Sequence, residues 1–189
     1  MSLKKHVPFL LTTLRLALGP VALAGAVWGL PRLWYVPLLA AGLGSDIFDG
    51  ILARRWRVAT PTLRRYDSIT DIIYYLFILA TAWTLDRALL IQCWPWIGAL
   101  IVAEATCITI SLLRFGAFPA THSFLAKAYG LGLFGTFVAL LGFGGPAWIV
   151  PALGLLGLVA DLEICAILLL SRRAPVDVPS VFSRWPERA

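Results

Sequence analysis

The sequence predicts an all-α integral membrane protein with six transmembrane helices. Hydrophobic residues make up 60% of its 189 residues, and only 14% are Asp, Glu, Lys or Arg. Apolar runs of about 20 residues recur along the chain, which is the length that a helix needs to cross a bilayer. The chain is too short for a second sizeable domain, so we expect one helical membrane domain over residues 1–173. A polar, proline-rich tail follows over residues 174–189, to which the sequence assigns no structure.

Six apolar runs define the expected helices in order. The first follows a short basic head and contains Arg15, which we expect to reach toward the cytoplasmic face or an acidic site. A basic loop separates the second run from the third, and Pro61 in that loop interrupts any continuous helix. Loops that contain glycine and proline separate the later apolar runs. The expected helices span approximately residues 9–30, 34–54, 66–85, 89–113, 125–143 and 148–171.

The positive charges predict how these helices are oriented. Six crossings place both termini on the same side of the membrane. All lysines and arginines fall on that side except Arg32 and Arg87. By the positive-inside rule, both termini are therefore expected in the cytoplasm.

The net charge of +6 indicates which partners to expect. Its basic residues border apolar runs, so we expect membrane lipid headgroups and phosphorylated substrates as partners, and no nucleic acid. The three cysteines, Cys93, Cys107 and Cys165, lie in apolar runs without the spacing of metal ligands. We interpret them as packing residues, with no indication of a disulfide framework or a redox role.

Residues 46–71 contain the candidate site, in the sequence DIFDGILARRWRVATPTLRRYDSITD. Asp46 and Asp49 have the i, i+3 spacing of one helix face, and Asp67 and Asp71 lie one helical turn apart in the next run. A carboxylate inside a membrane segment is costly, which makes each of these residues a functional candidate. A hairpin of two antiparallel helices would bring the four carboxylates together.

Four neighbouring carboxylates require a cation. Two charges about 4 Å apart repel by about 4 kcal/mol at an effective dielectric near 20. Oxygen ligands alone, with no His or Cys in the stretch, favour magnesium or manganese over zinc, and a pair of such ions commonly handles phosphate esters. Gly50 would let a ligand approach the helix backbone, and Arg54 could neutralise a phosphate. The alternative is that these acids simply pair with the neighbouring arginines.

The same stretch resembles the signature of the CDP-alcohol phosphotransferase family, which are integral membrane enzymes of phospholipid synthesis. The pattern is D-x2-D-G-x2-A-R-x8-G-x3-D-x3-D. Its matching positions are Asp46, Asp49, Gly50, Ala53, Arg54, Asp67 and Asp71. Leu63 stands where the family has its second glycine. A weaker likeness joins Pro8, Thr12 and Arg15 to the family's P-N-x-x-T-x-x-R pattern, with Phe9 in place of Asn.

This resemblance implies an activity and residue roles. It implies a CDP-linked lipid such as CDP-diacylglycerol as donor, an alcohol as nucleophile, CMP as leaving group, and a homodimer. Two Mg²⁺ or Mn²⁺ ions are expected on Asp46, Asp49, Asp67 and Asp71, with Asp71 as the general base. Donor contacts are expected from Gly50, Ala53, Arg54 and Thr12. We expect the protein in the inner or plasma membrane of a bacterium, with its active site facing the cytoplasm.

The basic residues on the cytoplasmic side favour an anionic acceptor. Arg114, Lys127 and Arg64 are the expected acceptor contacts, and a phosphorylated polyol such as glycerol 3-phosphate would suit them. The same residues could instead enforce topology and bind anionic lipid headgroups. A transferase for a neutral acceptor, such as serine or inositol, is therefore an alternative.

A membrane cation transporter is the second class of function. It would be expected to spread polar groups across the bilayer midplane or to show paired broken helices, whereas here the acids gather near one face. Glu104, Asp161 and Glu163 also lie in apolar runs. We expect them to make buried or interface hydrogen bonds, and Asp161 and Glu163, two residues apart, should face nearly opposite sides of one helix.

Overall fold

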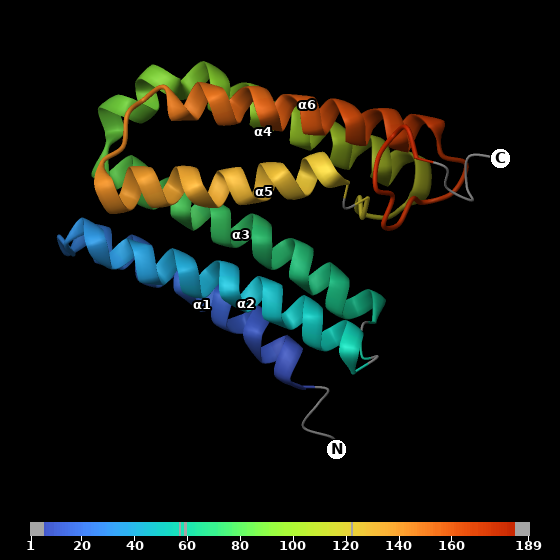
Figure 1. Ribbon diagram of the computed structural model, residues 1–189, viewed down its shortest axis with the longest axis horizontal. Helices are drawn as coiled ribbons and strands as arrows, with labels where there is room; N and C mark the ends of the chain where they lie inside the picture. Colours follow the sequence, from blue (N-terminus) through green and yellow to red (C-terminus); the bar gives the residue numbers. More distant parts are fainter. Residues whose placement is uncertain (1–5, 57, 59, 122, 184–189) are drawn as a thin grey trace. The chain divides into compact units, whose positions relative to one another are not determined.

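The computed structural model describes residues 6–56, 58, 60–121 and 123–183, with backbone only for residues 61, 62, 64, 65 and 68 (Figure 1). Its α-helices are α1 (His6–Val27), α2 (Tyr35–Arg55), α3 (Pro61–Leu85), α4 (Arg87–Phe115), α5 (Phe124–Phe137) and α6 (Ile149–Leu170). A short 3₁₀ helix, η2 (Arg32–Trp34), precedes α2, and a π-helical turn, η3 (Val138–Gly142), extends α5. In the described residues the only β-structure is an isolated bridge between Ala120 and Val176. The all-α prediction is confirmed.

Most of these helices are long and apolar enough to cross a membrane. The segments that meet this criterion are His6–Val27, Arg32–Arg55, Arg87–Phe115, Phe124–Gly142 and Ile149–Leu170. The exception is α3, whose apolar part is limited to Ile69–Leu85. Its first two turns carry charged residues, so the helix is long but its hydrophobic stretch is short. Length and hydropathy thus support five of the six predicted spans.

The start of α3 differs from the prediction, because the helix begins at Pro61 and not near residue 66. Thr60 is its N-cap, and its Oγ1 accepts a hydrogen bond from the backbone N–H of Leu63 at 3.1 Å. Proline suits the first helical position because the N–H that it lacks would have no partner within the helix. Pro61 therefore begins a helix, and it separates α3 from α2 as predicted.

The described helices fall into two compact units. The first comprises Met1–Leu90 and Phe137–Gly145, and so contains α1, α2, α3 and η3. The second comprises Ile91–Thr136 and Pro146–Ala189, with most of α4 and α5, all of α6 and the tail. The acidic stretch lies entirely within the first unit.

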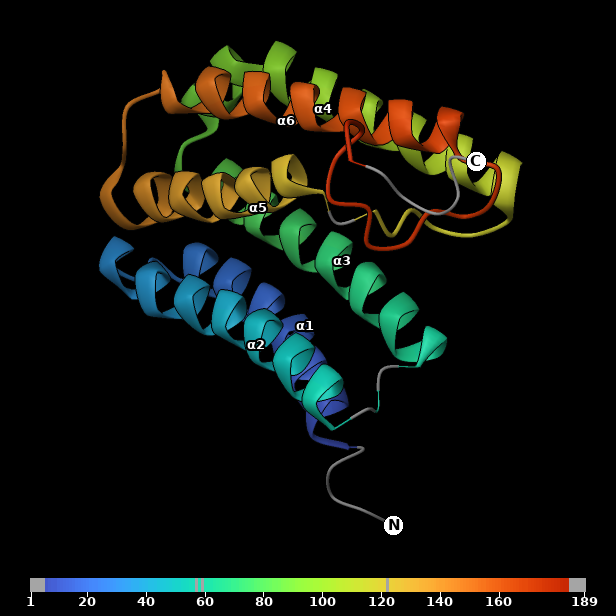
Figure 2. The same cartoon turned by 45° about the vertical axis from the view of Figure 1, so that its right-hand side comes forward.

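In the first unit, α1 packs against both α2 and α3 (Figure 2). Gly19 lets α1 approach α3, and Gly42 leaves room on α2 for the side chain of Tyr74 from α3. A Cβ on Gly19 of α1 would lie 3.0 Å from Cβ of Phe77, and one on Gly42 of α2 would overlap the hydroxyl of Tyr74. Small residues at such contacts let membrane helices pack backbone to backbone. This packing brings the first half of α1, the second half of α2 and the first half of α3 to the same end of the unit.

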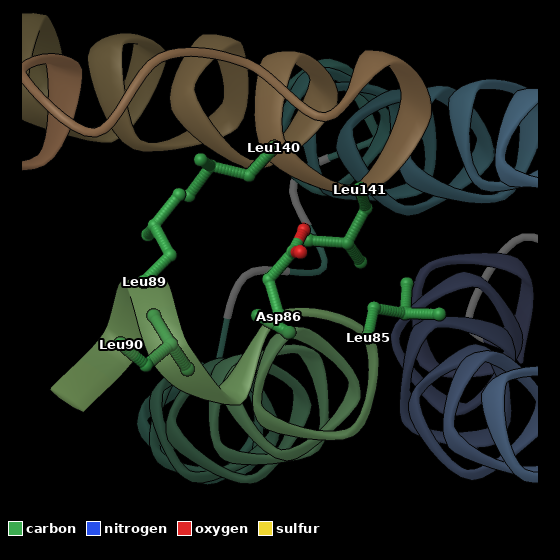
Figure 3. Close-up of a pocket in the computed structure, with 7 residues that line it drawn as sticks. Leu85, Asp86, Leu89, Leu90, Leu140 and Leu141 are labelled. Carbon is green, nitrogen blue, oxygen red and sulfur yellow. The ribbon is translucent and has the colours of Figure 1, made fainter.

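Contacts of Arg32 stabilise the opposite end of the first unit. Nη2 of Arg32 donates to Oδ2 of Asp86 at 2.8 Å, and Nη1 donates to the carbonyl of Leu140 at 2.9 Å. A small hollow beside Asp86 has mainly leucine walls, including Leu85 and Leu141 (Figure 3). Asp86 follows the last residue of α3, roughly 22 Å along the helix axis from Asp71. The hollow is therefore remote from the acidic stretch.

The second unit brings together residues that are scattered in the sequence. Sγ of Cys107 on α4 lies 3.0 Å from Sγ of Cys165 on α6, and both are free thiols. The sequence spacing gave no indication that these two cysteines are neighbours. The carboxyl groups of Asp161 on α6 and Glu104 on α4 lie close enough to interact with each other. This contact agrees with the polar role predicted for both acids.

The described part of the tail, residues 174–183, folds against α6, although the sequence assigned it no structure. Glu163 of α6 holds it, because its Oε1 accepts hydrogen bonds from Oγ of Ser180 at 2.8 Å and from the backbone N–H of Val181 at 3.2 Å. Val178 is buried against Ile167. Glu163 and Asp161 thus have different partners, as predicted from their spacing.

Candidate functional site

The first two aspartates lie on or beside the buried face of α2. The buried positions of α2 recur every three or four residues and form one stripe along the helix: Tyr35, Leu39, Gly42, Ser45, Asp49 and Ala53. Asp49 lies on this stripe, and its side chain is only 6% exposed. Asp46, one turn earlier, is beside the stripe and 43% exposed. The helix thus presents one buried carboxylate and one at the rim.

The first half of α3 supplies the other two aspartates. The side chains of Asp67 and Asp71 are 35% and 38% exposed, so both lie at the rim. One carboxylate oxygen from each of Asp46, Asp49 and Asp67 lies within 4.8 Å of the others. Carboxylates of α2 and α3 are therefore gathered as predicted, but the two helices are brought together by packing against α1 and do not form a closely packed pair of their own.

Arg15 of α1 joins all four carboxylates. Its Nη1 donates to Oδ1 of Asp46 at 2.6 Å and to Oδ1 of Asp71. Its Nη2 donates to Oδ2 of Asp49 at 3.1 Å and to Oδ1 of Asp67. The side chain is 3% exposed, and its Nε is buried with no hydrogen-bond partner among the described residues. A buried arginine is tolerated here because each of its terminal nitrogens contacts two anions.

Thr12 lies one turn before Arg15 on the same buried face of α1. Its Oγ1 is 2.9 Å from Oδ2 of Asp49 and 3.0 Å from the carbonyl of Pro8, and it can donate to either. Because Thr12 is itself buried, it contacts the site from behind Asp49. Thr12 is therefore positioned to orient the Asp49 carboxylate.

The three remaining residues of the sequence pattern on α2 have different surroundings. The three nearest atoms to a Cβ placed on Gly50 would all belong to the guanidinium of Arg54, at 3.5 to 3.9 Å. Arg54 is exposed, so its guanidinium can meet a ligand beside this uncovered stretch of backbone. Ala53 is buried in the interior of the unit. Gly50 and Arg54 are therefore accessible, whereas Ala53 is a packing residue.

The residues expected to bind the acceptor are not gathered in the same way. Arg114 donates to the carbonyls of Leu169 at 2.9 Å and Ser171 at 3.1 Å, so it satisfies the last turn of α6. Lys127 is exposed, and its Nζ lies 5.7 Å from the ring centroid of Phe124. The side chain of Arg64 lies outside the part of the chain that the structure describes.

Sequence reasoning did not include Arg15 among the site residues. Arg15 was expected to reach either the cytoplasmic face or an acidic site. It is also the last residue of the weak likeness to the family's P-N-x-x-T-x-x-R pattern. The available signal was the helical spacing that puts Thr12, Arg15 and Gly19 on one face of an otherwise apolar run. A basic group on the packed face of a membrane helix requires an anionic partner.

The donor set at this site fits a hard divalent cation. The three gathered ligands are all carboxylate oxygens, which magnesium and manganese prefer. Their oxygens lie within 4.8 Å of one another, so these residues could hold a metal ion together. The chemistry of the residues is thus compatible with the predicted metal site.

Comparisons with known proteins were made over the same region. A family model described as CDP-alcohol phosphatidyltransferase matches residues 5–174. A cardiolipin synthase (CMP-forming) from Streptomyces coelicolor is 30% identical over 125 residues, which cover 66% of this chain and 57% of that relative. The chain thus matches little more than half the length of this relative. No solved structure matches the chain.

Proposed function

Because the chain belongs to the CDP-alcohol phosphatidyltransferase family, we propose that it transfers the phosphatidyl group of CDP-diacylglycerol to an alcohol and releases CMP. The observation that carries this proposal is the set of three carboxylates within 4.8 Å of one another, inside the matched region. The name of the Streptomyces relative, which describes it as CMP-forming, supports CMP as the leaving group.

The site would hold Mg²⁺ or Mn²⁺. Members of the family generally use divalent metal ions. The ligands would be the carboxylates that surround Arg15, namely Asp46, Asp49, Asp67 and Asp71. Two bound ions would neutralise the donor pyrophosphate and favour in-line attack at its phosphorus.

The side chains of the protein would perform the remaining steps. The acceptor hydroxyl oxygen bonds to the phosphorus next to diacylglycerol, the bond from that phosphorus to the CMP oxygen breaks, and the hydroxyl proton passes to Asp71. Asp71 suits this role because it lies at the rim and outside the group of three carboxylates. Arg54 would contact a donor phosphate beside the open backbone of Gly50. Thr12 would keep Asp49 in place.

We propose that the termini and the site face the cytoplasm of a bacterial inner membrane. The basis is the charge distribution, in which nearly every lysine and arginine falls on one side of the expected helices. A cysteine placed between α2 and α3 should then react with a membrane-impermeant thiol reagent only after the cells are opened. Labelling of intact cells would contradict this orientation. A homodimer stays an expectation from the family resemblance alone.

We propose that the acceptor is anionic. The side of the chain proposed to face the cytoplasm is rich in arginine and lysine, while the acids would be bound to metal. A neutral alcohol would gain little from this positive charge, whereas a phosphate would gain charge-assisted hydrogen bonds. Glycerol 3-phosphate, an inositol phosphate and phosphatidylglycerol all meet this requirement, and the last is included because the relative is named for making cardiolipin.

Release of CMP tests the transferase proposal directly. Purified protein, CDP-diacylglycerol and Mg²⁺ or Mn²⁺ would be incubated with each of these anionic alcohols, and with serine and free inositol. We expect CMP with at least one anionic acceptor and none with the neutral ones. CMP released only with a neutral alcohol would refute the anionic acceptor but not the transfer. Absence of CMP with every acceptor, together with cation flux in proteoliposomes, would favour the transporter alternative.

Substitution of Lys127 tests the acceptor contact. We expect Lys127→Gln to raise the acceptor KM by about tenfold, since one charge-assisted hydrogen bond contributes about 1.5 to 3 kcal/mol. The donor KM should not change. Arg114 is less suitable for this test because its substitution would also remove the hydrogen bonds to the end of α6.

Arg87→Gln is the matched control for Lys127→Gln. Arg87 is also exposed, and its guanidinium carbon lies 5.4 Å from the ring centroid of Trp83, so both variants lose a cation beside an aromatic ring. Arg87 is expected on the other side of the membrane, and its substitution should leave both KM values unchanged. An unchanged acceptor KM in Lys127→Gln would remove this residue from the acceptor site.

A further inference from the structure

We propose that Arg15 is a built-in counterion that occupies the carboxylate centre in the metal-free protein and competes with metal ions for it. This inference rests on the metal site of the proposed function and assigns a role to a residue that the expected site did not include. Arg15 would then set the metal affinity of the site and preserve its structure when no metal is bound.

The position of the guanidinium is the first argument. A metal ion at this site would be held by oxygens of Asp46, Asp49 and Asp67, one from each of which lies within 4.8 Å of the others. The nitrogens of Arg15 already contact one oxygen of each of these residues. A metal ion held by these three carboxylates would therefore compete with Arg15 for their oxygens.

The second argument is the balance of charge. The four contacted aspartates carry four negative charges when ionised, and Arg15 supplies one positive charge at their centre. One arginine lowers the repulsion but does not neutralise the cluster, so the site keeps its attraction for divalent ions. Two divalent ions alone would balance the four carboxylates. With metal bound, the guanidinium thus becomes an excess positive charge that repels the ions.

The geometry of an arginine explains why this residue can substitute for metal. Its planar fork presents two terminal nitrogens, and here each contacts two carboxylates. Lysine offers only a single ammonium and cannot contact all four anions in the same way. Arginine and lysine at position 15 therefore differ in how many of the four carboxylates they can contact. Replacing Arg15 by lysine should thus have a smaller effect on metal binding than replacing it by glutamine.

Metal binding measured without turnover tests the competition. Chelator-treated protein in detergent would be titrated with Mn²⁺, and free Mn²⁺ would be quantified by electron paramagnetic resonance. We expect Arg15→Gln to bind Mn²⁺ at least tenfold more tightly than the wild-type protein, and Arg15→Lys to lie between them. The metal-free melting temperature should fall in the same order, because the carboxylates lose their counterion, and saturating Mn²⁺ should restore it.

Arg32→Gln provides the matched control. Arg32 is the arginine of the ion pair with Asp86 in the same unit, and it contacts none of the four aspartates in the described structure. We expect a lower melting temperature with an unchanged Mn²⁺ affinity. This result would separate loss of a structural arginine from loss of the competing cation.

The outcomes distinguish this inference from the proposed function. If Arg15→Gln and Arg15→Lys bind Mn²⁺ as the wild type does, or more weakly, Arg15 does not compete and the inference is overturned, while the metal site stands. Should Arg15→Gln fail to fold, Arg15→Lys alone decides between these results. If neither the wild type nor the variants bind Mn²⁺, the metal site of the proposed function fails with the inference.

Discussion

Asp49→Asn and Asp71→Asn are each expected to lower CMP release by at least about a hundredfold. For Asp71 this is the smallest effect usual for loss of a general base, and for Asp49 it follows from loss of a ligand to a metal ion that would contribute several kcal/mol. Asparagine has nearly the shape of aspartate, so the change removes a charge and leaves the packing of the helices largely intact. The assay is the release of CMP from CDP-diacylglycerol, with the amount of protein inserted in membranes measured in parallel.

The two variants should fail for different reasons. Asp49 is the most buried of the four carboxylates and is close to Oγ1 of Thr12. Its substitution would remove an inner metal ligand and should therefore weaken Mn²⁺ binding. Asp71 lies outside the group of three, so Asp71→Asn should reduce turnover more than metal affinity. The Mn²⁺ titration described for Arg15 separates these effects.

Asp86→Asn is the control for both variants. Asp86 is also an aspartate of the first unit, but it pairs with Arg32 at the far end of α3. We expect near wild-type turnover with some loss of stability. Wild-type turnover by Asp49→Asn or Asp71→Asn would refute the assigned roles, whatever the result for Asp86→Asn.

Removal of divalent metal ions is expected to have an effect of similar size. Exhaustive chelation should reduce turnover by at least about a hundredfold, because a pair of carboxylates about 4 Å apart already repels by about 4 kcal/mol and an anionic donor would add to that repulsion. Arg15 supplies a single positive charge against four aspartates. The protein would therefore bind the donor pyrophosphate poorly without metal.

Adding metal back should restore the activity selectively. We expect recovery with Mg²⁺ or Mn²⁺ and little with Zn²⁺, since the site offers carboxylate oxygens and the described part of the cluster includes no His or Cys. The chelated protein should stay folded, because Arg15 keeps the carboxylates together. Undiminished CMP release after chelation, with residual metal excluded by elemental analysis, would contradict metal dependence.

Local spacing explains why the acidic site could be predicted. Asp46 and Asp49, and likewise Asp67 and Asp71, lie about one helical turn apart, and this periodicity holds wherever the helix packs. The same argument predicted that Asp161 and Glu163, two residues apart, face different sides of their helix. The start of α3 was missed because Pro61 was interpreted as a helix breaker alone, although Thr60 before it provides a cap that makes proline a favourable first residue.

By itself, the sequence determined the helical class of the protein and the residues that form the acidic cluster, because both depend on composition and on spacing within single helices. The tertiary structure decided which residue lies at the centre of that cluster. The packing of α1 against both α2 and α3, close at Gly19, brings Arg15 to carboxylates that are 31 to 56 residues away in the chain. Long-range packing also explains why Arg114 donates hydrogen bonds to carbonyls at the end of α6. Such contacts depend on how helices approach one another, and the periodicity of a single helix carries no information about that approach.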